Sequence, residues 1–135
     1  MRIIKFRGKA LVNNEWVYGD LHIRSAFAHI HTDEGAKYKI DTDTVGQFTS
    51  LYDKNRKEIY EGDIVDFDDT PYCVNGSKYQ GVVVMHNGAW GVQHYEKCFD
   101  VYLYSPLFAD DFANRKTIIL GNIHDNPELL KGGKE

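Results

Sequence analysis

Short apolar segments recur along the whole chain, and polar or glycine-containing turns separate them roughly every eight to twelve residues. This spacing is typical of small antiparallel sandwiches and barrels. The strongest local signal is Asn87-Gly88, which lies between the apolar residues 79–86 and 89–95. Asn and Gly tolerate the positive φ of a tight turn, so the pattern predicts a hairpin. Residues 81–85 do not alternate, which predicts a central strand buried on both faces.

Two more hairpins are predicted in the first half of the chain. Each joins two short segments through a polar turn, and the paired segments are residues 9–12 with 15–23 and residues 27–31 with 36–40. Asn13-Asn14 forms the first turn and residues 32–35 form the second. Further along, residues 63–67 and 117–124 predict strands, and the polar residues 68–78 predict an exposed loop.

Two segments near the C-terminus predict helices. Residues 106–114 offer Ser105 as an N-cap and Pro106 at the first helical position. Residues 126–130 form the clearer case, because Asn126 is a good N-cap and Pro127 suits the position that follows it. This second segment predicts a short C-terminal helix.

These elements together predict a mainly β chain, with short strands and hairpins in one or two small SH3-like or pseudo-barrel lobes. Residues 1–135 are expected to form a single domain, with an N-terminal lobe over about residues 1–60 and a barrel-like C-terminal lobe over about residues 61–130. The side chains expected to be buried are Ile64, Val83, Trp90, Ile119 and Ile123.

Composition supports a folded chain. Of 135 residues, 42% are hydrophobic and 13% are aromatic, whereas disordered chains are poor in both. The net charge of −4 argues against a surface that is basic throughout. No apolar run approaches the roughly 20 residues of a spanning helix, and the N-terminus lacks the apolar core of a signal peptide. A cytoplasmic protein without membrane partners is therefore expected.

The two cysteines, Cys73 and Cys98, show no zinc-binding spacing and are expected to be reduced thiols. His29 and His31 share one face of a predicted strand, and Asp33 and Glu34 follow them. Such a set, with His22 on the preceding strand, is compatible with zinc or iron in a small metal-dependent hydrolase. Two ordinary histidines on a half-exposed strand explain the same pattern. We therefore expect no metal or other cofactor.

A basic stripe offers a different hypothesis. Lys5, Arg7 and Lys9 alternate with Phe6 and Gly8, so a strand would place three positive charges on one face at intervals of about 6.5–7 Å. This spacing suits the backbone of a single-stranded nucleic acid. Lysines on a sheet edge also serve simply to block pairing, and the acidic composition disfavours nucleic acid. The acids Asp63, Asp66, Asp68 and Asp69 are interpreted as solvated residues beside a loop rather than as a metal site.

Two motifs reveal a resemblance. Residues 45–65 read Val-Gly-Gln-Phe-Thr-Ser-Leu-Tyr-Asp-Lys-Asn-Arg-Lys-Glu-Ile-Tyr-Glu-Gly-Asp-Ile-Val, and residues 119–130 read Ile-Leu-Gly-Asn-Ile-His-Asp-Asn-Pro-Glu-Leu-Leu. Together with Lys5-Phe-Arg-Gly-Lys9 and Glu15-Trp-Val-Tyr-Gly19, they resemble the YopX-like family of small phage and prophage proteins. Members often carry Gly at position 56. Arg56 therefore predicts that the positive φ moves to Asn55 or that the turn type differs.

The resemblance implies a phage or prophage accessory protein with no established activity. The favoured hypothesis is a non-enzymatic binding or assembly module, without catalytic residues, that acts on an unknown host or phage protein. The alternatives are a metal-dependent hydrolase using His29 and His31, and a nucleic-acid binder using Lys5, Arg7 and Lys9. Unpaired strand edges invite self-pairing, so a homo-oligomer is also expected, with residues 2–8 as the edge.

Overall fold

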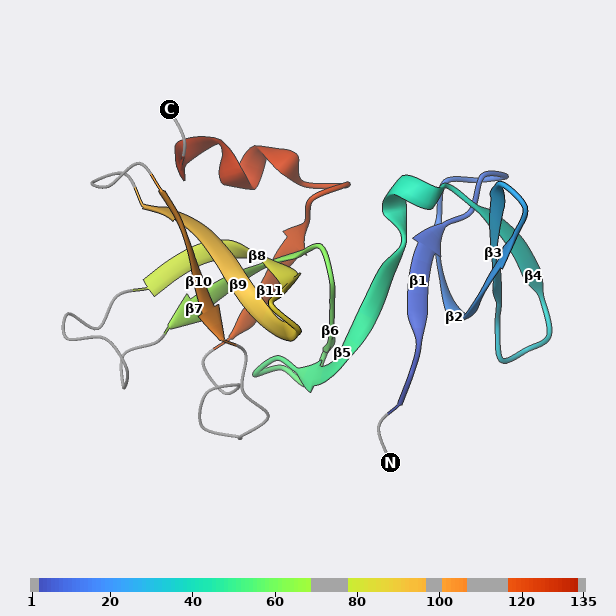
Figure 1. Ribbon diagram of the computed structural model, residues 1–135, viewed down its shortest axis with the longest axis horizontal. Coiled ribbons are helices and arrows are strands. Elements are labelled where there is room, and N and C mark those ends of the chain that lie inside the picture. The colour runs from blue at the N-terminus through green and yellow to red at the C-terminus, as the bar shows by residue number, and fades with distance from the viewer. Residues whose placement is uncertain (1–2, 69–77, 97–100, 107–116, 134–135) are drawn as a thin grey trace. The chain divides into compact units, whose positions relative to one another are not determined.

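The computed structural model describes residues 3–68, 78–96, 101–106 and 117–133. The described chain is built almost entirely from antiparallel strands and short 3₁₀ helices, which confirms the mainly β fold class. It divides into two compact units, Met1–Ser50 and Leu51–Glu135 (Figure 1). The predicted lobes placed this boundary about ten residues further along the chain. No described helix is long and apolar enough to cross a membrane.

The first unit holds one antiparallel sheet in the order β4-β3-β2-β1-β5. Its strands are β1 (Phe6–Lys9), β2 (Trp16–Arg24), β3 (Phe27–His31), β4 (Lys37–Ile40) and β5 (Gly46–Tyr52), whose last residues belong to the second unit. A short 3₁₀ helix, η1 (Thr42–Thr44), leads into β5, and the Asp41 carboxylate caps it by accepting from the N–H of Asp43.

Both predicted hairpins of the first unit form. β3 pairs with β4, and the first turn places a positive φ of 60° on Asn14. β1 begins earlier than expected, however, and residues 9–12 contribute only Lys9 and an isolated bridge between Ala10 and Ile40. The expected free edge at residues 2–8 is wrong, because β1 pairs with β2 on one side and β5 on the other. Self-association remains a prediction.

A small apolar core fills one face of this sheet. Ala28, Ile30 and Ile40 are almost fully buried there. The partly buried side chains packed against them are Phe6, Val17, Leu21, Tyr38 and Val45. Gly8 is required at this face, since a Cβ there would collide with the Ile40 side chain. Successive residues of a strand point to opposite faces, so the polar residues between these apolar ones lie on the outer face.

The second unit contains a five-stranded antiparallel sheet in the order β10-β9-β8-β7-β11. Its strands are β7 (Asp63–Asp68), β8 (Lys78–His86), β9 (Ala89–Glu96), β10 (Val101–Pro106) and β11 (Ile118–Asn122). A short strand, β6 (Glu58–Tyr60), precedes them and pairs with β5, as the sixth strand of the other sheet. Asn87 and Gly88 both have positive φ and join β8 to β9 with His86 opposite Ala89, so the predicted hairpin is confirmed.

The structure differs in detail from the predicted C-terminal helix and barrel. Residues Pro127–Gly133 form a 3₁₀ helix, η3, whose opening Leu129 N–H donates to the Asn126 carbonyl three residues earlier. Within the described residues the strands form two antiparallel sheets and no closed barrel. Pro106 ends β10, and the rest of the helix expected at residues 106–114 lies outside the described part of the chain, as do residues 69–77 of the expected loop.

The second core consists of Ile59, Val65, Val83 and Val92, with Leu51, Trp90 and Ile119 packed against it. Ile64 and Val83 are fully buried as predicted, whereas Trp90 and Ile119 are only partly buried. The prediction for Ile123 is wrong: it is 37% exposed, because it follows the end of β11. β8 is central, but Met85 is 48% exposed, so both-face burial holds only for part of that strand.

The first family motif builds a turn around one buried carboxylate. Asp53 accepts hydrogen bonds from the backbone N–H groups of Asn55, Lys57 and Ile119. Arg56 has a φ of +64°, so the positive φ stays at this position instead of moving to Asn55. Glycine adopts this positive φ without strain, whereas a residue with a side chain, such as Arg56, rarely does.

Candidate functional site

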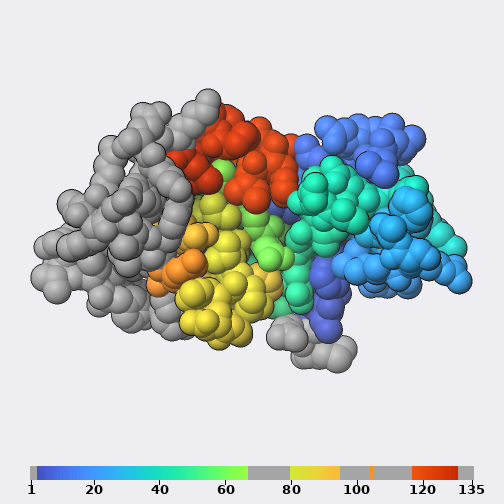
Figure 2. Space-filling view, turned by 45° about the horizontal axis from the view of Figure 1, so that its top comes forward, coloured from blue at the N-terminus to red at the C-terminus, as the bar shows by residue number. Residues whose placement is uncertain are grey.

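The outer faces of β2, β3 and β4 gather most of the chemistry of the first unit. Cross-strand register places Asp20 opposite His31, His22 opposite His29, and Arg24 opposite Phe27. On the other side of β3, His31 pairs with Lys37 and His29 with Lys39. We call these eight residues the basic face: Asp20, His22, Arg24, Phe27, His29, His31, Lys37 and Lys39. Figure 2 shows atoms of β3 and β4, in light blue to cyan, at the surface of this unit.

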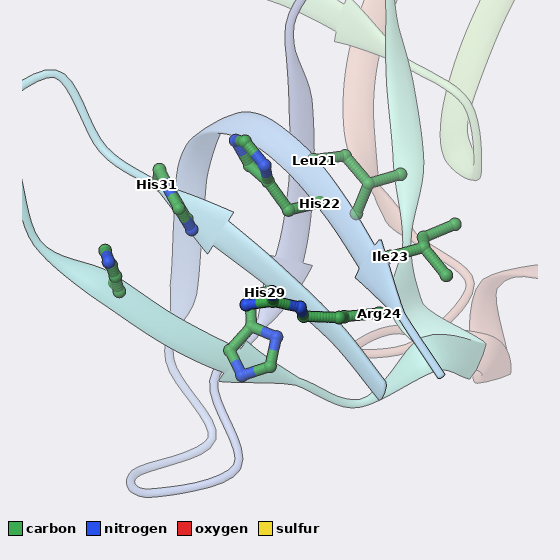
Figure 3. Close-up of a pocket in the computed structure, with 7 residues that line it drawn as sticks. Leu21, His22, Ile23, Arg24, His29 and His31 are labelled. Atoms are coloured by element: carbon green, nitrogen blue, oxygen red, sulfur yellow. The ribbon is translucent and has the colours of Figure 1, made fainter. Parts of the chain in front are cut away.

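An open groove of about 580 Å³ lies on this part of the sheet. The residues that line it are Leu21, His22, Ile23, Arg24, His29, His31 and Lys37. Figure 3 shows the side chains of His22 and Arg24 pointing away from those of Leu21 and Ile23, as the alternation along β2 requires. The polar part of the lining therefore consists of nitrogen groups that are cationic or become cationic on protonation.

Two histidines of the groove are stacked. The ring centroids of His22 and His31 are 3.8 Å apart, and the ring planes differ by 17°. Partial burial lowers the pKa of His31 below its ordinary value, and the neighbouring His22, Lys37 and His29 lower this pKa further. Asp20 acts in the opposite direction. His31 is therefore neutral at pH 7, and anything negative brought into the groove favours its protonation.

The stacked geometry is poorly suited to a shared metal ion. Imidazole nitrogens bind metals through lone pairs in the ring plane, so two parallel rings direct those lone pairs side by side rather than toward one point. Asp33 and Glu34 are exposed residues at the turn between β3 and β4. Within the part of the chain that the structure describes, no group of three His, Cys, Asp or Glu has a metal-binding arrangement. The histidines instead form part of a basic surface.

An aromatic residue lies at one end of the basic face. Phe27 is 50% exposed, and the Lys39 ammonium lies 3.5 Å from the centroid of its ring. This distance is within the range of a cation–π contact, which holds the lysine over the ring. The face therefore combines fixed positive charge with an accessible aromatic surface.

The stripe expected on β1 takes a different form. The Arg7 guanidinium lies 4.5 Å and the Lys9 ammonium 5.4 Å from the ring centroid of Trp16, while Lys5 lies over Phe48. Arg7 is only 6% exposed. The sequence thus located the alternation of charges correctly, but these charges contact aromatic side chains of their own sheet.

Sequence reasoning found His22, His29 and His31 but missed Arg24, Phe27, Lys37 and Lys39. Around β3 only the hairpin with residues 36–40 was predicted, and the pairing of β2 with β3, which brings Arg24 and Phe27 together, was not. The predicted turn over residues 32–35 would pair His31 with Ala36, whereas the observed register pairs His31 with Lys37. A shift of one residue moves a side chain to the other face of the sheet, so the predicted register could not place the lysines beside the histidines.

The interpretation of the acids around β7 as solvated residues is wrong for Asp63, which holds a backbone hydrogen bond in the interior. Asp63 is 2% exposed and accepts a hydrogen bond of 2.8 Å from the backbone N–H of Tyr60. Asp66 lies half-buried on β7. Asp69, Cys73 and Cys98 lie outside the described residues.

Comparisons with known proteins agree on lineage and fold. The family described as YopX protein matches residues 5–131, nearly the whole chain. No match is found among curated proteins. The structure is similar to the crystal structure of protein EF1440 from Enterococcus faecalis, with a TM-score of 0.51 and 22% sequence identity. The likeness covers 97% of this chain and 100% of the other, and at this identity it bears on the fold alone.

Proposed function

The chain belongs to the YopX family, and we propose that it is a non-enzymatic phage or prophage accessory protein whose first unit binds single-stranded nucleic acid. The binding surface is the basic face of β2, β3 and β4. One observation carries the proposal: this face has three Lys or Arg side chains and three histidines, but only one carboxylate, that of Asp20. The acidic composition of the whole chain, which disfavoured nucleic acid, does not describe this surface.

Electrostatics supports an anionic polymer as the partner. Lys37 and Lys39 are two residues apart on β4 and both are exposed, so strand geometry places them about 6.5–7 Å from each other. Adjacent phosphates of a single strand have a similar spacing. Arg24 adds a guanidinium at the other side of the face, and guanidinium groups bind phosphate oxygens in a bidentate manner.

Aromatic surface on the same sheet supports a single strand rather than a duplex. Phe27 is half-exposed, and Tyr18, two residues before Asp20 on β2, is 43% exposed. Bases of a single strand are free to stack on such rings, whereas bases of a duplex are already stacked on each other.

Fluorescence anisotropy with a labelled oligothymidine tests the proposal. The double variant Lys37→Gln/Lys39→Gln should weaken binding and reduce the slope of log Kobs against log salt concentration by about 1.4, since each phosphate contact to a single strand contributes about 0.7. Lys54→Gln/Lys57→Gln is the matched control, because it removes the same charge from exposed residues of the second unit. Equal losses in both variants would overturn the proposed surface, and absence of binding by the unmodified chain would overturn the function.

A further inference from the structure

We propose that the groove on β2, β3 and β4 is a phosphate-binding site in which His31, stacked on His22, takes up a proton as phosphate binds. The proposal rests on the proposed function for the source of the phosphate, which is the backbone of a single strand. It goes further by assigning the residues that receive this group and by coupling its binding to pH.

The composition of the groove points to an oxyanion. His22, His31 and Lys37 supply ring N–H or ammonium donors from three neighbouring strands, because Lys37 lies directly opposite His31. Arg24 and His29 complete the polar lining. A backbone phosphodiester has acceptor oxygens and no proton to donate, so its hydrogen-bonding capacity matches a lining made of donors.

The stacked pair explains why a proton accompanies the anion. With ring centroids 3.8 Å apart, charging both imidazoles would place two positive charges in close contact. The charged and titratable groups that face the pair are Asp20 and Arg24 on β2, His29 on β3, and Lys37 and Lys39 on β4. Only one of these five carries negative charge. In the empty groove this surrounding positive charge disfavours protonation of His31, and a bound phosphate reverses the local charge balance.

The direction of the pH dependence follows from this reversal. The pKa of His31 in the free protein lies below its ordinary value, and a bound anion raises this pKa. The proton therefore contributes fully to binding below the free-protein pKa, and its contribution is lost as pH rises through the higher pKa of the complex. Affinity should increase on acidification, by at most about tenfold per pH unit for one proton taken up.

Two measurements test the site. In the first, NMR follows the His31 Cε1–H resonance as pH is varied, with and without inorganic phosphate, and then with sulfate, which keeps its charge over the same range. Both anions should raise the pKa of His31. In the second, oligothymidine affinity is measured at pH 7.5 and 5.5, where the unmodified chain should bind at least about fivefold more tightly at the lower pH. His31→Gln should reduce this ratio to less than about twofold.

His86→Gln is the matched control, because His86 is an exposed histidine stacked on Tyr104 in the second unit. It should retain the full pH dependence. Oligothymidine binding that does not change with pH, together with a His31 pKa unaffected by either anion, would overturn the phosphate site and leave the proposed function intact. A His31 pKa raised by both anions without oligothymidine binding would support the site and overturn the nucleic-acid function. A pH dependence abolished equally by His86→Gln would also overturn the site.

Discussion

The two units of this chain differ in net charge. Residues 1–50 contain seven Lys and Arg against six Asp and Glu, whereas residues 51–135 contain nine against fourteen. The net charge of −4 therefore hides a first unit of net charge +1 and a second of −5. Alternation along three strands then concentrates basic side chains of the first unit on one face. A whole-chain charge is a poor guide to partners when charge is divided between units.

The units also differ in what their recognisable sequence does. The motifs that carry the family resemblance lie largely in the second unit, where their polar residues make backbone hydrogen bonds. Asp53 joins the turn before β6 to β11, and Gly62 both donates to Val83 and accepts from Ile123. The groove lies between residues 21 and 37, outside those motifs. The family motifs thus stabilise the fold, whereas the candidate binding residues lie outside them.

The largest expected effects come from opening one core at a time. Ile30→Ala and Ile59→Ala each truncate a fully buried side chain and should cost about 2–5 kcal/mol. Each unit contains one tryptophan, Trp16 or Trp90, so Trp90→Phe and Trp16→Phe backgrounds let fluorescence report each unit separately. We expect Ile30→Ala to lower the urea midpoint reported by Trp16. The midpoint reported by Trp90 should stay unchanged. Equal shifts at both tryptophans would show that the units unfold as one cooperative block.

A somewhat smaller effect is expected from the buried carboxylate of the second unit. Asp53→Ala leaves three backbone N–H groups without their acceptor and should lower the free energy of unfolding by about 2–4 kcal/mol. Asp53→Asn keeps an acceptor oxygen and should cost less. Asp33→Ala, at an exposed turn of the first unit, should change stability by less than about 0.5 kcal/mol. Similar midpoints for Asp53→Ala and Asp33→Ala in urea denaturation would contradict the structural role of Asp53.

The smallest expected effect is a gain. Arg56→Gly relieves a side chain held at a φ of +64° and should stabilise the second unit by about 0.5–1 kcal/mol, net of the extra entropy of glycine in the unfolded chain. Asn87→Gly is the comparison, because Asn tolerates its φ of 51° better and should gain less. Thermal denaturation measures both, and a loss of stability in Arg56→Gly would mean that the Arg56 side chain contributes more than its backbone strain costs.

Local patterns predicted local pairing well and long-range placement poorly. The Asn87-Gly88 hairpin and the β3–β4 hairpin were predicted because the turn and both strands lie within one short segment. β1 was expected at a sheet edge. Its alternation of charged and apolar residues does not show how many strands pair with it. β5, which arrives 40 residues later, makes it an internal strand. Ile123 was expected in the core because an apolar side chain next to a strand looks the same whether the strand continues or has ended.

The candidate site divides in the same way. That His29 and His31 share a face, and that Lys5, Arg7 and Lys9 share another, follows from the two-residue period of a strand and was visible in the sequence. Which of these groups meet was decided by pairing across strands. The fold stacks His22 on His31 and brings Lys37 beside them, whereas it directs Arg7 and Lys9 onto Trp16. The sequence by itself shows which side chains of a strand share a face. The neighbours and solvent exposure of each side chain depend on the register between strands, which only the tertiary structure determines.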